Sequence, residues 1–251
     1  MNKEIPIEQL KDLKLLVLDS DGVCIPRGTR IVQTEEGDDF KVSFSTKIIE
    51  DRLAKKINRL KKKLIICVSS GRSMIYLQAM YSKILGGETI LMAENGALTL
   101  RCGVLKRLTY LPVEELLAKI REDVKKLPIL GFEPKQFILT VHCDTELKEV
   151  YDIVKKHDKF NALKVMWNGE AFDIQDKEMS KGDGLMKILK LLKLSPENVV
   201  AIGDRINDKE LVGIAGIGVS ADKDSLPASY WVEGEQLGGE ILVDYLISKL
   251  L

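Results

Sequence analysis

The chain has 251 residues, with 38 Lys plus Arg against 38 Asp plus Glu, so its formal net charge is zero. A neutral chain has no overall field to attract nucleic acid or anionic lipid, so neither is expected as a partner. No apolar run approaches the roughly 20 residues of a membrane span, and Met1–Lys14 lacks the apolar centre of a signal peptide, so we expect a soluble, cytoplasmic protein with no membrane partner.

The first informative stretch is the apolar run Leu15–Leu18, which reads as a strand buried on both faces and ends at Asp19-Ser20-Asp21-Gly22. Ligands bind at the carboxyl ends of strands in open α/β sheets, so Asp19 and Asp21 are placed for chemistry. Taken alone, the tetrapeptide also fits a polar turn after a core strand.

The next segment, 25–45, is predicted to form a hairpin near the Asp19 edge, because two β-prone runs flank an acidic turn. This hairpin is a candidate flap over the site.

Alternating helix and strand patterns follow and predict a parallel sheet. A helix is expected over 46–62, and a buried strand at 64–68 ends in Ser69-Ser70-Gly71. Ser73 is a candidate cap for the next helix, to about residue 85, and a third strand at 88–93 ends at Glu94-Asn95-Gly96. The order strand, helix, strand, helix, strand is typical of a parallel α/β core.

Residues 97–173 break this pattern. Short adjacent strands and two helices, at 113–126 and 146–157, predict an antiparallel sheet with helices on one face. We therefore interpret 97–173 as a smaller α+β cap domain inserted into a catalytic core of residues 1–96 and 174–251. The core pattern then resumes with a helix at 181–192, a strand at 198–204, a helix from about 208, strands at 216–220 and 230–232, and a last helix at 240–251. The expected fold class is α/β, a Rossmann-like parallel sheet core with the inserted cap.

Polar clusters lie where core elements begin or end: Asp19 with Asp21, Ser69–Arg72, Lys181, and Asp204 with Asn207 and Asp208. Strands that read as buried end at Asp19, Ser70 and Asp204, so these residues should meet at one sheet edge. A helix running antiparallel to the strands brings Lys181 to the same edge. The alternatives are a surface lysine, a serine turn and a helix cap at Asp208; together they leave the acidic cluster unexplained.

The residue types at this edge suit phosphate chemistry. Four scattered cysteines without a C-x-x-C pair and only two histidines leave carboxylates as the main reactive groups. Four aspartates and a phosphate dianion would bring together about six negative charges, and two unit charges 4 Å apart repel by roughly 4 kcal/mol at an effective dielectric of 20. A divalent cation is therefore expected, and oxygen ligands favour Mg²⁺. Lys181, the Ser70 hydroxyl, loop amides such as that of Gly71, and Asn207 are expected to bind the phosphate.

The ordered motifs resemble those of the haloacid dehalogenase-like hydrolases, in particular the Cof-like branch that includes archaeal phosphoglycolate phosphatases and sucrose-phosphate phosphatases. The matching stretches are DSDGV at Asp19–Val23, SSGR around Ser70, SKGDGL around Lys181, GDRIND at Gly203–Asp208 and the pre-cap turn ENGA at Glu94–Ala97. The chain departs from the family pattern twice, with Val23 in place of the usual threonine and with a longer hairpin at 25–45.

The resemblance implies an activity and a ligand set. Asp19 would be the nucleophile and Asp21 the acid and base, with Asn95 among the substrate-binding residues. Asp19, the Asp21 main-chain carbonyl and Asp204 would bind Mg²⁺, and Asp208 would bind it directly or through water. The implied reaction is hydrolysis of a small phosphorylated metabolite, a sugar phosphate or phosphoglycolate, through an aspartyl-phosphate on Asp19.

Two other functions stay open at this point. A phosphomutase of the phosphomannomutase-like type would return the phosphate to the sugar, and a sugar-phosphate-binding protein would be expected to lack Asp19, Asp21 or Lys181. The sequence makes no prediction of the oligomeric state.

Substrate specificity is expected to come from the cap, including Trp167 and Glu170 at a hairpin tip, and from the hairpin at 25–45. Arg72 reaches either a substrate anion or the surface, and His142-Cys143-Asp144 is expected to be structural because adjacent strand residues point to opposite faces.

Overall fold

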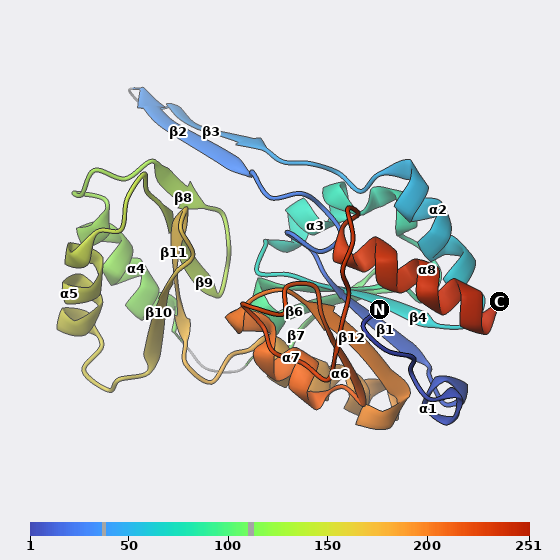
Figure 1. The fold of residues 1–251 in the computed structure, drawn as a ribbon. Coiled ribbons are helices and arrows are strands. Elements are labelled where there is room, and N and C mark those ends of the chain that lie inside the picture. The colour runs from blue at the N-terminus through green and yellow to red at the C-terminus, as the bar shows by residue number, and fades with distance from the viewer. Residues whose placement is uncertain (37–38, 110–112) are drawn as a thin grey trace. The chain divides into compact units, whose positions relative to one another are not determined.

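The computed structural model describes residues 1–36, 39–109 and 113–251. The chain divides into two compact units, drawn in Figure 1. Unit 1 comprises Met1–Arg27, Lys47–Thr109 and Ser180–Leu251, and unit 2 comprises Gly28–Thr46 and Tyr110–Met179. Each unit has its own sheet and its own apolar core, so each is described by itself.

Unit 1 is built on an eight-stranded sheet in the order β14-β13-β12-β1-β4-β5-β6-β7. The central strand β1 is buried along its whole length, because its run of Leu and Val suits a strand that is covered on both faces. The parallel strands are β1 (Leu15–Asp19), β4 (Ile65–Ser69), β5 (Ile90–Ala93), β12 (Val199–Gly203), β13 (Ile217–Ser220) and β14 (Tyr230–Trp231). The antiparallel strands β6 (Leu98–Arg101) and β7 (Val104–Arg107) extend the sheet at one end.

Helices cover both faces of this sheet (Figure 1). One layer contains α2 (Asp51–Leu60), α3 (Met74–Met80) and α8 (Gly238–Leu250), and the other contains α6 (Lys181–Leu192) and α7 (Lys209–Ile214). Alternate β1 residues, Leu15 and Val17, pack with Leu185 of α6 and Leu211 of α7. The short helices of unit 1 are α1 (Ile7–Lys11), η1 (Ser82–Ile84), η2 (Glu94–Gly96), η3 (Pro196–Asn198) and η4 (Ile206–Asp208). A sheet covered on both faces leaves the carboxyl ends of its parallel strands as the place for a ligand.

Unit 2 has a four-stranded antiparallel sheet in the order β10-β11-β9-β8. Its core lies between this sheet and two helices, where Val141 and Phe172 pack against Leu117 and Val150. The strands are β8 (Gly131–Glu133), β9 (Ile138–His142), β10 (Leu163–Trp167) and β11 (Ala171–Asp176), and the helices are α4 (Glu114–Val124) and α5 (Lys148–His157). Because successive strand residues point to opposite faces, the residues between these apolar positions lie on the face away from the helices.

The hairpin predicted within 25–45 is present as β2 (Arg30–Glu36) and β3 (Asp39–Ser45). It groups with unit 2, where the Phe132 backbone N–H donates to Gln33 Oε1 at 3.0 Å. Residues 37–38 of the acidic turn, like residues 110–112, lie outside the described residues.

The α/β fold class is confirmed, but the unit boundaries differ from the expected core and cap. Residues 97–109 belong to the core sheet, since β6 pairs with β5 in the register Ile90↔Arg101. The hairpin groups with unit 2 rather than with residues 1–96, and the second segment of unit 2 ends at Met179 rather than at residue 173. The physical reason is that two antiparallel strands at the end of a parallel sheet have the same local pattern as strands of a separate antiparallel domain.

Individual elements also differ from expectation. The helix expected from Thr46 begins at Asp51, because Glu50 is extended and the Ile49 backbone N–H donates to Met80 O at 2.9 Å. The short elements α1 and β8 were not predicted. The helix expected at 181–192 has the predicted bounds. None of the helices in the described part of the chain combines the length and the apolar character of a membrane span.

Candidate active site

The polar clusters noted in the sequence meet at the carboxyl-terminal edge of the unit 1 sheet. Asp19 is the last residue of β1, Ser70 follows β4, and Asp204 follows β12; these three strands are neighbours in the sheet. Lys181 is the first residue of α6, whose N-terminus is capped by the Ser180 side chain accepting from the Asp183 N–H at 3.1 Å. Chain segments far apart in sequence thus deliver acidic, hydroxyl and cationic groups to one edge.

Lys181 lies at the centre of this group. Its Nζ is 2.5 Å from Asp19 Oδ1 and 2.6 Å from Asp208 Oδ1, and its side chain is 2% exposed. Burial opposes the charged ammonium, but the carboxylates of Asp19 and Asp208 raise the pKa of Lys181 above its usual value. The lysine is therefore a fixed positive charge shared by two acids.

Three carboxylates crowd around this lysine. Asp19, Asp204 and Asp208 each offer an oxygen, and the three oxygens lie within 4.8 Å of one another; no other such group occurs among the described residues. Burial and the charge of Asp208 raise the pKa of Asp19 to about 8, against the opposing effect of Lys181. Burial also raises the pKa of Asp204, although Arg27 opposes this. The negative charges of these three carboxylates are therefore only partly balanced by the basic residues around them.

This donor set fits a divalent cation. The three side chains are buried, they offer oxygen atoms only, and the raised pKa of Asp19 shows that further positive charge would be favourable there. Mg²⁺ prefers such oxygen ligands and keeps part of its water shell for a substrate phosphate.

The loops around the carboxylates pack tightly. Asp208 Oδ2 accepts from the backbone N–H groups of Asp204 at 3.2 Å and Arg205 at 3.3 Å, which holds the turn after β12. Gly22 has φ +90°, in the left-handed region, and a Cβ there would collide with Asp204 Oδ2. The glycine that follows Asp21 therefore lets the first loop approach the last carboxylate.

Asp21 is held by Arg72, whose role the sequence left open. Arg72 Nε donates to Asp21 Oδ2 at 3.2 Å and Nη2 donates to Oδ1 at 3.0 Å, a two-point contact between side chains that are 14% and 16% exposed. The Arg72 backbone N–H also donates to Ser70 Oγ at 3.2 Å. Arg72 thus joins the loops after β1 and β4.

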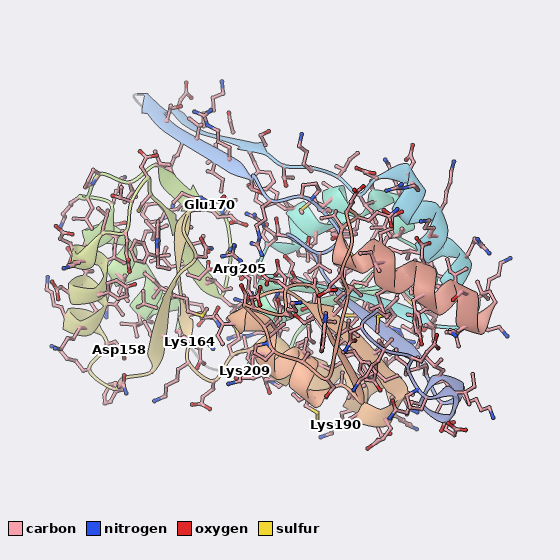
Figure 2. All side chains as sticks on the ribbon, in the orientation of Figure 1. Asp158, Lys164, Glu170, Lys190, Arg205 and Lys209 are labelled. Carbon is pink, nitrogen blue, oxygen red and sulfur yellow. The ribbon has the colours of Figure 1, made fainter. Side chains whose placement is uncertain are left out.

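The remaining predicted substrate-binding residues fall into two places. Asn95, in η2 with φ 51°, donates its backbone N–H to Ser70 O at 3.1 Å, and a Cβ on Gly71 would lie 3.1 Å from Asn95 Oδ1. Ser70, Gly71 and Asn95 therefore form one loop cluster. Asn207, in η4, is exposed, and among the described residues it hydrogen-bonds to none of the three carboxylates. Figure 2 labels two residues near it in the chain, Arg205 just before η4 and Lys209 at the start of α7.

Sequence reasoning missed two residues at this edge. Arg27 Nη2 lies 2.6 Å from Asp204 Oδ2, and the only signal was a basic residue shortly after the Asp19–Gly22 motif. Buried Tyr81 donates its hydroxyl to Ser20 Oγ at 2.9 Å, directly between the two motif aspartates. Neither contact follows from a local pattern.

Three residues of unit 2 that the sequence singled out, His142, Cys143 and Trp167, have partners within that unit. Cys143 lies in the apolar core, whereas His142 points to the opposite face, with Nε2 3.6 Å from Glu133 Oε2. Trp167 packs on Phe172 with ring centroids 4.7 Å apart. Glu170 is exposed (Figure 2).

The fold and the site together define a class: an α/β protein with acidic motifs at the carboxyl edge of a parallel sheet and a second, smaller unit. The family model described as haloacid dehalogenase-like hydrolase matches residues 117–223. A phosphoglycolate phosphatase from Methanococcoides burtonii is 26% identical over 226 residues, covering 78% of this chain and 88% of that protein. A phosphoglycolate phosphatase from Methanopyrus kandleri is 28% identical over 166 residues, covering 64% and 70%.

Solved structures share the fold. A haloacid dehalogenase-like hydrolase from Bacteroides thetaiotaomicron superposes with a TM-score of 0.67 at 15% identity, covering 93% of this chain and 99% of that one. The family model and these relatives support membership of the chain in the haloacid dehalogenase-like hydrolases. It is an enzyme, and it stands among the phosphatases of that superfamily.

Proposed function

We propose that this enzyme is a Mg²⁺-dependent phosphomonoesterase that hydrolyses a small phosphorylated metabolite through an aspartyl-phosphate on Asp19. The observation that carries the proposal is the buried Lys181, which bridges Asp19 and Asp208 beside the crowded carboxylate of Asp204. A fixed cation next to a nucleophilic carboxylate and a cation-binding acid cluster suits the transfer of a phosphoryl group.

Asp19, Asp204 and Asp208 would hold the cation, and the family resemblance adds the Asp21 main-chain carbonyl. When bound, Mg²⁺ supplies the positive charge that keeps Asp19 ionised and offsets the charge of the phosphate. Lys181 adds a fixed charge on the same side, and the Ser70 hydroxyl and the Gly71 amide donate to phosphate oxygens.

In the first step, an Asp19 oxygen attacks phosphorus. The new bond joins that oxygen to phosphorus, the ester P–O bond breaks, and the leaving alkoxide takes a proton from Asp21. In the second step, Asp21 takes a proton from a water molecule that attacks the same phosphorus, which releases inorganic phosphate and restores Asp19. Arg72 donates to both carboxylate oxygens of Asp21, so proton donation by Asp21 in the first step requires that one of these contacts be lost.

For the substrate, we propose phosphoglycolate as the first candidate and sugar phosphates as the second. The first four relatives compared all carry the name phosphoglycolate phosphatase. The Asp19 edge recognises only the phosphate, so residues outside this cluster must distinguish one leaving group from another.

The test is a panel of phosphorylated metabolites assayed for released phosphate with MgCl₂, with a small aryl phosphate as reference. We expect phosphoglycolate or a sugar phosphate to exceed the aryl phosphate in kcat/KM. Phosphate release also separates a phosphatase from a phosphomutase, which would yield an isomerised sugar phosphate instead. No phosphate release from any member, with Mg²⁺ present and the protein folded, would contradict the proposal.

A further inference from the structure

Arg27 occupies a position that the proposed mechanism does not use. Its guanidinium Nη2 lies 2.6 Å from Asp204 Oδ2, on one of the three carboxylates that form the cation-binding cluster. We propose that Arg27 is an exchangeable counter-charge, which pairs with Asp204 when no divalent ion is bound and has to leave that carboxylate for the ion to bind there. This inference rests on the proposed cation site.

The charges of the cluster favour such an exchange. Asp19, Asp204 and Asp208 carry three negative charges when ionised, and Lys181 and Arg27 carry one positive charge each. The sum is −1 without a metal ion, 0 when a divalent ion takes the place of Arg27, and +1 when ion and guanidinium are both present. Like charges a few ångströms apart repel in a partly buried site, so the ion and Arg27 compete for Asp204.

The two basic residues differ in how firmly they are held. Lys181 contacts two carboxylates, and its side chain is 2% exposed. Arg27 contacts only Asp204 among the cluster acids, through one nitrogen, and its side chain is 41% exposed. A half-exposed ion pair contributes little net stability and exchanges readily with solvent, whereas a buried lysine between two acids does not. Arg27 is therefore the basic residue that can be displaced.

The surroundings give the displaced side chain a place to go. Arg27 and Asp204 line a cavity of about 480 Å³ in unit 1, which is also lined by Arg205 and Asp222. A Cβ on Gly22 would lie 2.9 Å from Arg27 Nε, so this glycine leaves the room that the guanidinium occupies beside Asp204. The cavity gives solvent access to Asp204, and the Asp222 carboxylate in the same cavity can receive the released guanidinium.

The experiment measures metal affinity in the absence of substrate. Calorimetric titration of MgCl₂, repeated with MnCl₂, compares the wild-type protein with Arg27→Gln and with the matched control Arg52→Gln. Arg52 forms an ion pair of similar geometry with Glu240, at 2.7 Å in the same unit, away from the carboxylate cluster. We expect the Kd for Mg²⁺ to fall about 3- to 5-fold in Arg27→Gln, the size expected for loss of a half-exposed competing pair, and to be unchanged in Arg52→Gln.

A second measurement follows the wild-type side chain directly. The Arg27 Nε–H resonance, assigned by its absence in Arg27→Lys, should shift on addition of MgCl₂, and it should not shift in Asp204→Asn. A higher Kd in Arg27→Gln would overturn the inference, because Arg27 would then be a residue that orients Asp204 for the ion. An unchanged Kd, or an Nε–H resonance insensitive to Mg²⁺, would overturn it too. If the wild-type protein binds no divalent ion, the proposed cation site fails and this inference fails with it.

Discussion

Each unit contains a buried cluster of charged side chains, and the two clusters differ in how their charges are arranged. In unit 1, oxygens of Asp19, Asp204 and Asp208 lie within 4.8 Å of one another, with one buried lysine between two of the acids. In unit 2, the Lys135 ammonium lies 3.3 Å from Glu133 Oε2 and 3.5 Å from Asp173 Oδ1, and its side chain is 3% exposed.

The unit 2 cluster is a network in which hydrogen bonds accompany the charges. Lys135 also donates to Thr140 Oγ1 at 2.7 Å, and the Thr140 hydroxyl donates to Asp173. Because the lysine stands between the two acids, each carboxylate has a partner and the network stabilises a fold. In unit 1 the carboxylates crowd against one another, and burial together with the charge of Asp208 raises the pKa of Asp19. Lys181 also bridges two acids, but a third carboxylate, Asp204, crowds against them, and this excess of negative charge indicates a ligand to be bound.

The strongest test of this contrast removes the proposed nucleophile, Asp19. Asp19→Asn should lower kcat by about 10⁴-fold or more while keeping the fold, because the amide is nearly isosteric but cannot attack phosphorus. Phosphate release from an aryl phosphate measures the loss, and circular dichroism checks the fold. The matched control is Asp244→Asn, which should retain activity; Asp244 lies on α8 and pairs with Lys56 of α2. Normal turnover by Asp19→Asn would place the nucleophile elsewhere.

Removal of divalent metal should have the next largest effect. With EDTA, activity should fall about 10³-fold, because the ion-free carboxylates repel the phosphate, and burial and the charge of Asp208 raise the pKa of Asp19. MgCl₂ should restore it and should raise Tm in the wild-type protein, through preferential binding to the folded state, but much less in Asp204→Asn. Full turnover in EDTA, with no metal detected by elemental analysis, would exclude the metal role.

The unit 2 network should respond in the opposite way, with a loss of stability rather than of chemistry. Lys135→Met leaves Glu133 and Asp173 without their shared base and should destabilise unit 2 by about 3 kcal/mol. Hydrogen exchange of the β9 and β11 amides measures this, while kcat on an aryl phosphate should change less than about twofold. A large loss of kcat at unchanged stability would show that the charge arrangement does not distinguish structural from chemical clusters.

The smallest effect is expected at a partly exposed cluster of unit 2. Hydrogen bonds from Lys126, His157 and Lys156 lower the pKa of Asp123 below its ordinary value of 3.8. A lowered folded-state pKa stabilises the fold above the unfolded-state pKa, and this contribution is lost as pH falls through the folded-state value. The Tm difference between the wild-type protein and Asp123→Asn should therefore be small but present at pH 7 and should shrink below about pH 4. A difference that grows on acidification would contradict the assigned direction.

Much of the site was predictable from residues near one another in the chain. Apolar runs that stop at Asp19, Ser70 and Asp204 mark buried strands, and parallel order then requires their ends to share an edge. The start of α6 at Lys181 was also predictable, since Ser180 is a good N-cap and an apolar helical face follows. These signals lie within short stretches of sequence, so they can be read without knowing which elements pack against one another.

Contacts between distant residues were not predictable in this way. Arg27 and Asp204 are 177 positions apart, and Arg72 and Asp21 are 51 apart; no periodicity links either pair, because side-chain pairing depends on where whole elements pack. The assignment of β6 and β7 to the core sheet failed for a related reason. An antiparallel strand pair has the same alternating pattern in any sheet, and only its hydrogen bonds to β5 show which sheet it extends.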